Sequence, residues 1–200
     1  SPYGQSNTQL DATYEQLNSA LGFKTSPVTG LWFNIYGGYQ DLKNNLASAA
    51  IANYSGSYLQ LLQGNMHNIY AGAEASYSYK DIISFTASGI YRDWKTAKTE
   101  NNSGDQLLYY MPSFEASFKV DIRPISSVLI NLGYQHITRE KIGNERVDPV
   151  GNLYLGGSYE VFEGISIYVR ANNLLNKDYQ YYPGYPTEGI NFMGGVSFRF

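Results

Sequence analysis

The sequence predicts an all-β protein: an antiparallel transmembrane β-barrel of the outer-membrane type, or the C-terminal portion of one, with about 9–10 strands. Three observations predict it. Apolar and polar residues alternate along most of the chain, and the alternating stretches exceed the ~5–6 residues of a usual soluble strand. The connections between them alternate between short and long, and short turns on one side with long loops on the other are typical of outer-membrane barrels.

The clearest alternation closes the chain, over residues 190–200. Hydrophobic side chains fall on one face, and Asn191, Ser197 and Arg199 fall on the other. A repeat of two residues indicates a strand. The hydrophobic face of this stretch consists of Ile190, Phe192, Val196, Phe198 and Phe200.

The same pattern runs through the chain from about residue 12 onward. The best helix candidate, residues 44–52, is short. We therefore expect one partial-barrel domain over residues 1–200, with residues 1–11 as candidates for disorder. The further predicted strands are 31–40, 69–80, 82–94, 110–122, 127–136, 151–161 and 165–173.

The connections between these strands alternate in length. Short connections are predicted near 26–29, 80–81, 123–125 and 163–164. Long polar connections are predicted near 42–65, 95–106, 140–150 and 174–189. In a barrel, the apolar face of each strand would meet lipid. The residues expected to face lipid are Ile69, Ala71, Ala73, Ile83, Phe85, Phe114, Phe118, Val120, Ile165, Ile167, Val169, Phe192, Val196, Phe198 and Phe200.

Tyrosine is the unusual residue, at 20 of 200 positions. Its apolar ring and polar hydroxyl suit sheet faces, binding surfaces and membrane interfaces. No run approaches the roughly 18 apolar residues of a transmembrane helix, so a transmembrane helix is excluded. Transmembrane strands are not excluded, because half of their side chains face a polar lumen and their mean hydropathy is therefore low. A net charge of -3 argues against nucleic-acid binding, and the absence of cysteine excludes disulfides and thiolate chemistry.

Few side chains suggest chemistry. The two histidines, His67 and His136, are isolated in the sequence, and two isolated histidines make no metal site. No Ser-His-Asp arrangement is visible, so we predict no enzyme activity, no catalytic residue, no cofactor and no metal. Charged residues on the polar face of the strands are expected to pair, to line a channel or to lie against a plug. They are Glu74, Glu115, Asp121, Glu160, Lys80, Lys119, Arg92 and Arg170.

The closing segment also carries a motif. Asn173, Leu174, Asn176 and Tyr179 follow the spacing NLxNxxY, and a Tyr-Pro-Gly loop, YYPGYP, comes next before the chain ends as VSFRF. Together these features resemble the C-terminal part of the β-barrel of a TonB-dependent receptor, an outer-membrane active transporter, as found in Bacteroidetes-type sequences. The stretches GLWFNIYGGYQD and NIYAGAEASYSYKD resemble strands of the same family.

The resemblance implies a location in the bacterial outer membrane and a role in importing a scarce nutrient, such as a siderophore, a cobalamin or a glycan. A full receptor has an N-terminal plug, a TonB box and a barrel of about 22 strands. This chain has room for no plug, so we expect it to be a barrel segment that is not an active transporter alone. The expected partners are outer-membrane lipid and the remaining strands and plug of a larger receptor, with no nucleic acid.

The resemblance also suggests roles for two groups of aromatic residues. In outer-membrane barrels a C-terminal aromatic on the last strand is the signal read by the barrel-assembly machinery, and Val196, Phe198 and Phe200 fit that signal. The loop residues Tyr181, Tyr182 and Tyr185 are candidate extracellular ligand contacts, since aromatic loops bind sugars and siderophores well. The simpler interpretation of both groups is packing, or a place in the interfacial aromatic belt.

Two other interpretations stay open on the sequence alone. The first is a stand-alone outer-membrane barrel of about 8–10 strands with a structural or adhesive role, because a barrel of that size is filled by its own side chains. The second is a soluble antiparallel β-domain, which also alternates. The long strands, and an apolar face rich in Ala, Tyr and Phe, favour the membrane.

Overall fold

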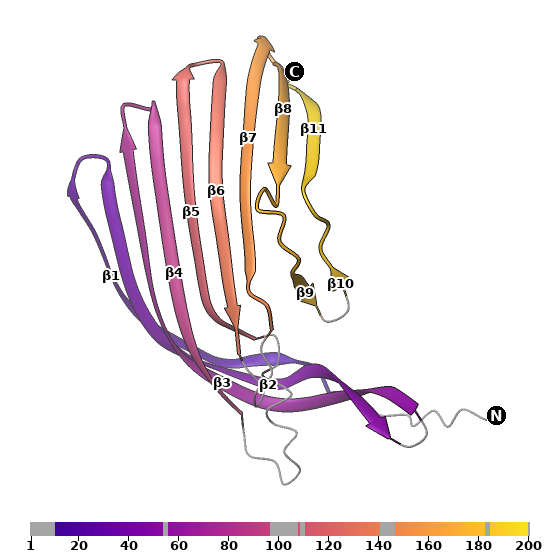
Figure 1. Cartoon of the computed structure of the whole chain (residues 1–200). Helices are drawn as coiled ribbons and strands as arrows, with labels where there is room; N and C mark the ends of the chain where they lie inside the picture. The colour runs from indigo at the N-terminus through magenta and orange to yellow at the C-terminus, as the bar shows by residue number, and fades with distance from the viewer. Residues whose placement is uncertain are drawn as a thin grey trace.

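The computed structural model describes residues 11–53, 56–96, 108, 111–140, 147–182 and 185–199, without the side chains of 46–53, 56–62, 181–182 and 185. These residues form a curved antiparallel sheet of nine strands in the order β1-β2-β3-β4-β5-β6-β7-β8-β11, and β9 and β10 form a separate pair (Figure 1). The strands are β1 Tyr14–Val28, β2 Leu31–Asn53, β3 Gly56–Tyr79, β4 Ile83–Thr96, β5 Pro112–Ile125, β6 Val128–Arg139, β7 Val150–Phe162, β8 Ile165–Asn172, β9 Gln180–Tyr182, β10 Tyr185–Pro186 and β11 Asn191–Phe198.

The sheet is a meander in which each strand is a neighbour of the strand before it, apart from the small β9–β10 pair. The predicted all-β class and the number of strands are therefore confirmed. Within the described part of the chain, β1 and β11 each pair on one side only, and they form the two edges of the curved sheet (Figure 1).

The two ends of the sheet differ in their connections. At one end, which we call the short-turn end, the chain reverses within two or three residues. Gly30 and Gly164 adopt positive φ there (84° and 83°), as do Lys80 and Asp81 (47° and 55°), which is the conformation that tight hairpins require. At the opposite end, which we call the long-loop end, lie the β9–β10 pair and the segments that lead into it (Figure 1). Most of the long connections predicted near 95–106 and 140–150 lie outside the described residues.

The long connection predicted over 42–65 is wrong, and so is the helix candidate over 44–52. β2 and β3 continue as a paired hairpin out to Asn53 and Gly56, with a register irregularity between Leu42 and Asn45. Pairing between the two strands satisfies the backbone groups of this extension that face the partner strand, whereas an isolated helix of so few residues is marginal in water. The extension also places His67 inside β3 rather than at a loop border.

Smaller corrections concern the turns. β1 runs on to Val28 and β5 to Ile125, so these two turns begin later than predicted. Lys80 was expected on the polar face of a strand, but it is a turn residue whose ammonium lies 5.3 Å from the centre of the Tyr79 ring. Positive φ at Lys80 is compatible with the turn and not with the pleat of a strand.

The buried core of the described residues is small and lies at the long-loop end. Met66 and Trp94 are buried together, and Leu42, Leu108 and Met111 pack against them. The indole nitrogen of Trp94 donates to the carbonyl oxygen of Pro112 at 2.8 Å. This cluster therefore holds the residues just before β5 against the ends of β3 and β4.

Candidate functional site

One face of the sheet is apolar and open. Cross-strand pairs continue this face without interruption, for example from Phe85 to Val120 to Leu132, and from Gly157 to Val169 to Gly194. Large hydrophobic side chains on it are exposed, for example Leu21 at 86% and Phe192 at 80%. A soluble monomer rarely exposes so large an apolar surface, so this outer face, as we call it, is suited to contact with lipid.

The length of the apolar stretch on each strand supports this interpretation. On β3 the outer face carries apolar side chains from Ile69 to Tyr79, and on β5 from Phe114 to Ile122. These spans match the ~9–11 residues of a tilted transmembrane strand. Val120, expected to face lipid, does lie on this face, but it is only 9% exposed because Phe85 and Leu132 flank it on the neighbouring strands.

Tyrosine and histidine meet on the outer face towards the long-loop end. The rings of Tyr39 and His67 are 5.7 Å apart. The Tyr134 hydroxyl lies 3.3 Å from Nδ1 of His136, whose Nε2 lies 2.9 Å from Oγ1 of Thr138. Amphipathic rings gather at this depth in membrane proteins, so both histidines have a structural explanation that needs no metal.

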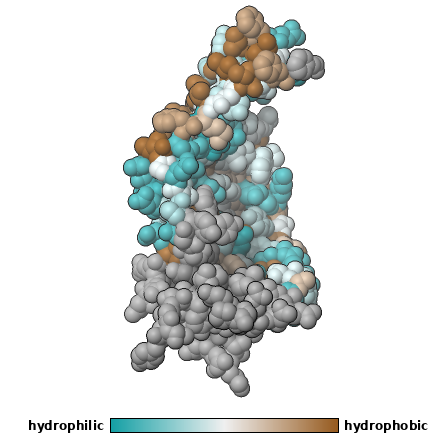
Figure 2. All heavy atoms as spheres, turned by 90° about the vertical axis from the view of Figure 1, so that its right-hand side faces the viewer, coloured by the Kyte–Doolittle hydropathy of each residue, from teal (hydrophilic) through white to brown (hydrophobic). Residues whose placement is uncertain are grey.

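The opposite, inner face is polar and bonded across strands. Ser88 and Ser117 are 2.7 Å apart, and Arg92 forms an ion pair with Glu115. Lys119 forms a second ion pair, at 3.1 Å, with Asp121 on its own strand. The charges predicted for this face therefore lie there and partly neutralise each other, with the exception of Lys80. In Figure 2, seen from the β11 side of the sheet, hydrophobic side chains gather at the top and hydrophilic ones lie beneath them.

Tyrosines on the inner face lie over glycines on adjacent strands. A Cβ added to Gly133 would be 2.1 Å from Cζ of Tyr154, and one added to Gly195 would be 2.4 Å from the Tyr168 hydroxyl. Each pair is in direct register across the sheet. Aromatic rings that cover strand glycines restore packing that the glycine lacks. The remaining two pairs of this kind are Tyr36 with Gly72 and Tyr70 with Gly38.

The motif that begins at Asn173 forms a loop that is held together by hydrogen bonds of the Asn173 side chain. Asn173 has a positive φ of 51° and is 1% exposed. Its side-chain nitrogen donates to the carbonyl oxygens of Lys177 (3.0 Å) and Glu188 (3.1 Å), and its side-chain oxygen accepts from the Lys177 amide (3.1 Å). Oδ1 of Asn152 accepts from its backbone amide at 2.8 Å. Asn173 therefore connects both ends of the loop, at Lys177 and Glu188, to the first residues of β7.

The rest of the motif closes the same loop. The carbonyl oxygen of Tyr179, a buried residue, accepts from the amide and the hydroxyl of Thr187 at 3.0 and 2.9 Å. Arg139, also buried, donates to the carbonyl oxygen of Gln180. The motif thus makes a folded platform at the long-loop end. Its role in folding was missed in the sequence, although the αL-tolerant asparagines Asn173 and Asn176 were a signal.

The residues predicted as ligand contacts belong to this loop. Tyr181 and Tyr182 lie in β9 and Tyr185 in β10, which pair antiparallel. Their side chains lie outside the described residues, so contact with a ligand stays a prediction. Of the assembly signal, Val196 and Phe198 are exposed on the outer face (53% and 60%), and Phe200 lies outside the described residues.

One carboxyl group at the long-loop end has an altered pKa. Burial raises the pKa of Glu140 above the usual range, the carboxylate of Asp93 raises it further, and Lys95 opposes both. Lys95 also forms a 3.1 Å ion pair with Asp93. Among the residues that the structure describes, no group of His, Cys, Asp and Glu side chains is arranged to hold a metal ion. The described residues contain no helix long and apolar enough to cross a membrane.

The sequence matches no family model and no curated protein. Solved structures do match. The chain is similar to the copper transporter OprC (17% identity, 92% of this chain, 31% of that chain, TM-score 0.68). It is also similar to the ferric-catecholate import receptor Fiu of E. coli K12 (15%, 92%, 27%, 0.65) and to the FrpB iron transporter of Neisseria meningitidis (15%, 92%, 31%, 0.66).

The chain spans about a third of the length of these structures. A likeness at this level of identity establishes the fold and leaves the substrate open. The neighbours are transporters and receptors, and another is an outer-membrane protein, OmpT of Vibrio cholerae (13% identity, TM-score 0.56). The fold of this chain is an all-β, nine-stranded antiparallel sheet that matches part of the barrel of TonB-dependent receptors.

Proposed function

We propose that this chain is a C-terminal segment of the barrel wall of a TonB-dependent receptor in the bacterial outer membrane. The receptor would import a scarce nutrient such as a siderophore, a cobalamin or a glycan. The observation that carries the proposal is the two-faced sheet, apolar outside and polar inside, with the fold of about a third of a known importer. Iron and copper importers among the neighbours favour a metal chelate as cargo.

The edges of the sheet support a larger assembly. Within the described residues β1 and β11 each have one free edge, and an open edge is not viable in hydrocarbon because its backbone groups have no partner. Further strands must therefore pair with these edges in the membrane. We infer that they belong to the same receptor and that this segment, without them and a plug, does not transport.

The inner face supports contact with a polar filling such as a plug. The charged side chains of this face stay accessible, since Glu115 is 35% exposed and Lys119 is 50% exposed. A polar domain inside the barrel would supply hydrogen-bond partners to such groups, because polar groups that are buried on contact are normally bonded.

The native size of the product tests the proposal. An antibody raised against this chain is used to blot the outer-membrane fraction of its source. A band several-fold larger than 22.4 kDa, lost together with uptake of the nutrient on gene disruption, is the expected result. A heat-modifiable band near 22.4 kDa would contradict it and favour a small barrel with a structural or adhesive role.

A further inference from the structure

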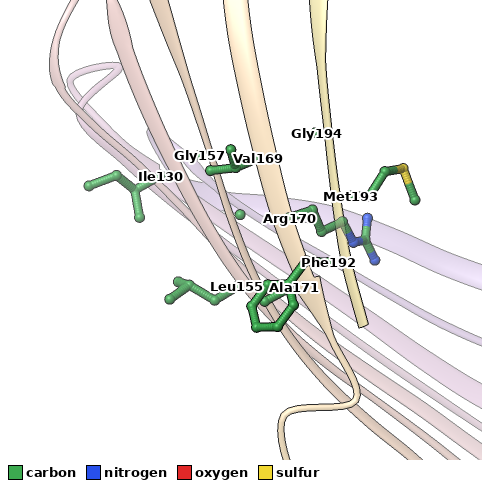
Figure 3. Close-up of a pocket in the computed structure, with 10 residues that line it drawn as sticks. Ile130, Leu155, Gly157, Val169, Arg170, Ala171, Phe192, Met193 and Gly194 are labelled. Carbon is green, nitrogen blue, oxygen red and sulfur yellow. The ribbon is translucent and has the colours of Figure 1, made fainter. Parts of the chain in front are cut away.

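A hollow of about 520 Å³ lies on the outer face over β6, β7, β8 and β11. Its centre is Val169, which faces Gly157 on one neighbouring strand and Gly194 on the other. Ile130, Leu155 and Phe192 form part of its wall. Figure 3 shows the side chains of Ile130 and Leu155 on one side of the sheet and those of Arg170 and Met193 projecting to the opposite side, so the hollow is open to the apolar face.

The two glycines create this hollow, and a side chain has more room at Gly157 than at Gly194, where a Cβ would contact a backbone carbonyl oxygen tightly. A Cβ added to Gly157 would have its nearest neighbour, the carbonyl oxygen of Leu129, at 3.5 Å, and one added to Gly194 would lie 3.3 Å from the carbonyl oxygen of Tyr168. Neither glycine has a positive φ. On the inner face, by contrast, the ring of Tyr154 leaves no room for a Cβ at Gly133.

Glycine in a strand interior lowers stability and often marks a place where a ligand approaches the backbone closely. We propose that this hollow binds one acyl chain of a membrane lipid, seated over Gly157 and Gly194 on either side of Val169. The inference rests on the proposed function, because it requires the outer face to lie in a bilayer.

The chemistry of the hollow selects hydrocarbon. Its exposed lining is apolar, and a dry apolar cavity does not hold water. The backbone groups of Gly157 and Val169 belong to strands that are paired on both sides, so an added strand could not pair with them. The free edge of β11 lies only at the border of the hollow. The hollow is also continuous with the face proposed to meet lipid.

Native mass spectrometry tests the inference on the polypeptide that carries this chain, purified from outer membranes in mild detergent. The wild type is expected to retain a lipid, and a variant with Gly157→Leu and Gly194→Leu is expected to lose it. Ala87→Leu, on the outer face away from the hollow, is the matched control and is expected to keep the lipid. Equal lipid retention by the wild type and the filled variant, or none in the wild type, would overturn the proposal.

A second measurement covers the case in which the filled variant does not fold. Ile130→Trp places a fluorophore at the wall of the hollow, and a phosphatidylethanolamine with a brominated acyl chain is titrated into the detergent solution. Quenching is expected to saturate at one lipid per protein, whereas quenching of Ile69→Trp, on a distant part of the outer face, rises in proportion to lipid. Proportional quenching at both positions overturns the proposal.

The outcomes separate this inference from the proposed function. If the polypeptide fractionates with the outer membrane and yet retains no lipid, the acyl-chain site fails and the barrel assignment stands. If it does not fractionate with the membrane, both fail. Cross-linking of a Val169→Cys variant to a polypeptide instead of lipid would identify the hollow as a protein interface and would also refute the acyl chain.

Discussion

The ring of Tyr154 on β7 lies so close over Gly133 on β6 that a Cβ at residue 133 would be 2.1 Å from its Cζ atom. The two residues are direct cross-strand partners. The guanidinium carbon of Arg170 on β8 lies 4.0 Å from the centre of the same ring. One tyrosine thus joins three strands of the inner face through packing and a cation–π contact.

This contact predicts the effect of a single methyl group. Gly133→Ala is expected to lower the free energy of unfolding by about 1–3 kcal/mol, because the ring must leave its place. Urea unfolding of the protein in lipid vesicles measures it. Gly157→Ala is the control, since a Cβ there has room (3.5 Å), and it is expected to be neutral or to stabilise slightly. Equal losses from both variants would refute the packing argument.

Two variants of Asn173 distinguish the contribution of its side-chain hydrogen bonds from that of its backbone conformation. Asn173→Gly keeps the positive φ of 51° accessible but removes the side-chain bonds to Lys177 and Glu188. We expect a loss of about 1–3 kcal/mol in the stability of the loop, detected as faster proteolysis within residues 173–190. Asn173→Ala adds backbone strain and is expected to be cleaved faster still. A glycine variant as resistant as the wild type would show that the bonds contribute nothing.

Alternation placed the faces of most strands correctly, and its failures have physical causes. Residues such as Ile167 and Val169 were predictable because successive side chains of a strand point to opposite faces, and one face of this sheet is apolar. The paired extension of β2 and β3 past Leu42 carries no clear alternation, so its strands were not predicted. The register between neighbouring strands could not be predicted from the sequence either. The pairing of Tyr154 with Gly133 depends on that register and so was not predicted.

The candidate site was predictable only in part for a similar reason. The motif at Asn173 was recognised by resemblance, but its bonds reach to Glu188, and such a distance along the chain depends on how the loop folds. The charged residues of the inner face followed from periodicity alone, whereas the ion pair of Arg92 with Glu115 required the neighbouring strands to be placed.

Glu140 predicts a dependence of stability on pH. Burial and Asp93 raise the pKa of this carboxyl group in the folded protein. A carboxyl group whose folded pKa exceeds its unfolded pKa favours the folded state when protonated, and this contribution is lost as the pH rises through the folded pKa. Glu140→Gln, which stays neutral, is therefore expected to be more stable than the wild type at neutral pH. The difference should vanish near about pH 3, where both side chains are uncharged. Chemical unfolding at several pH values measures this, and a difference independent of pH would refute it.

Val169 tests which face meets the membrane. The side chain is 67% exposed on the outer face, and Ser166 lies on the inner face of the same strand. Val169→Lys is expected to destabilise the protein by about 2–4 kcal/mol if residue 169 meets hydrocarbon near the bilayer centre. Ser166→Lys is the control and is expected to have little effect, because it faces the polar interior opposite Glu160. Unfolding in lipid vesicles separates the two variants. A near-neutral Val169→Lys, or a larger loss for Ser166→Lys, would reverse the assignment of the two faces and with it the argument that this sheet is a wall between lipid and a polar interior.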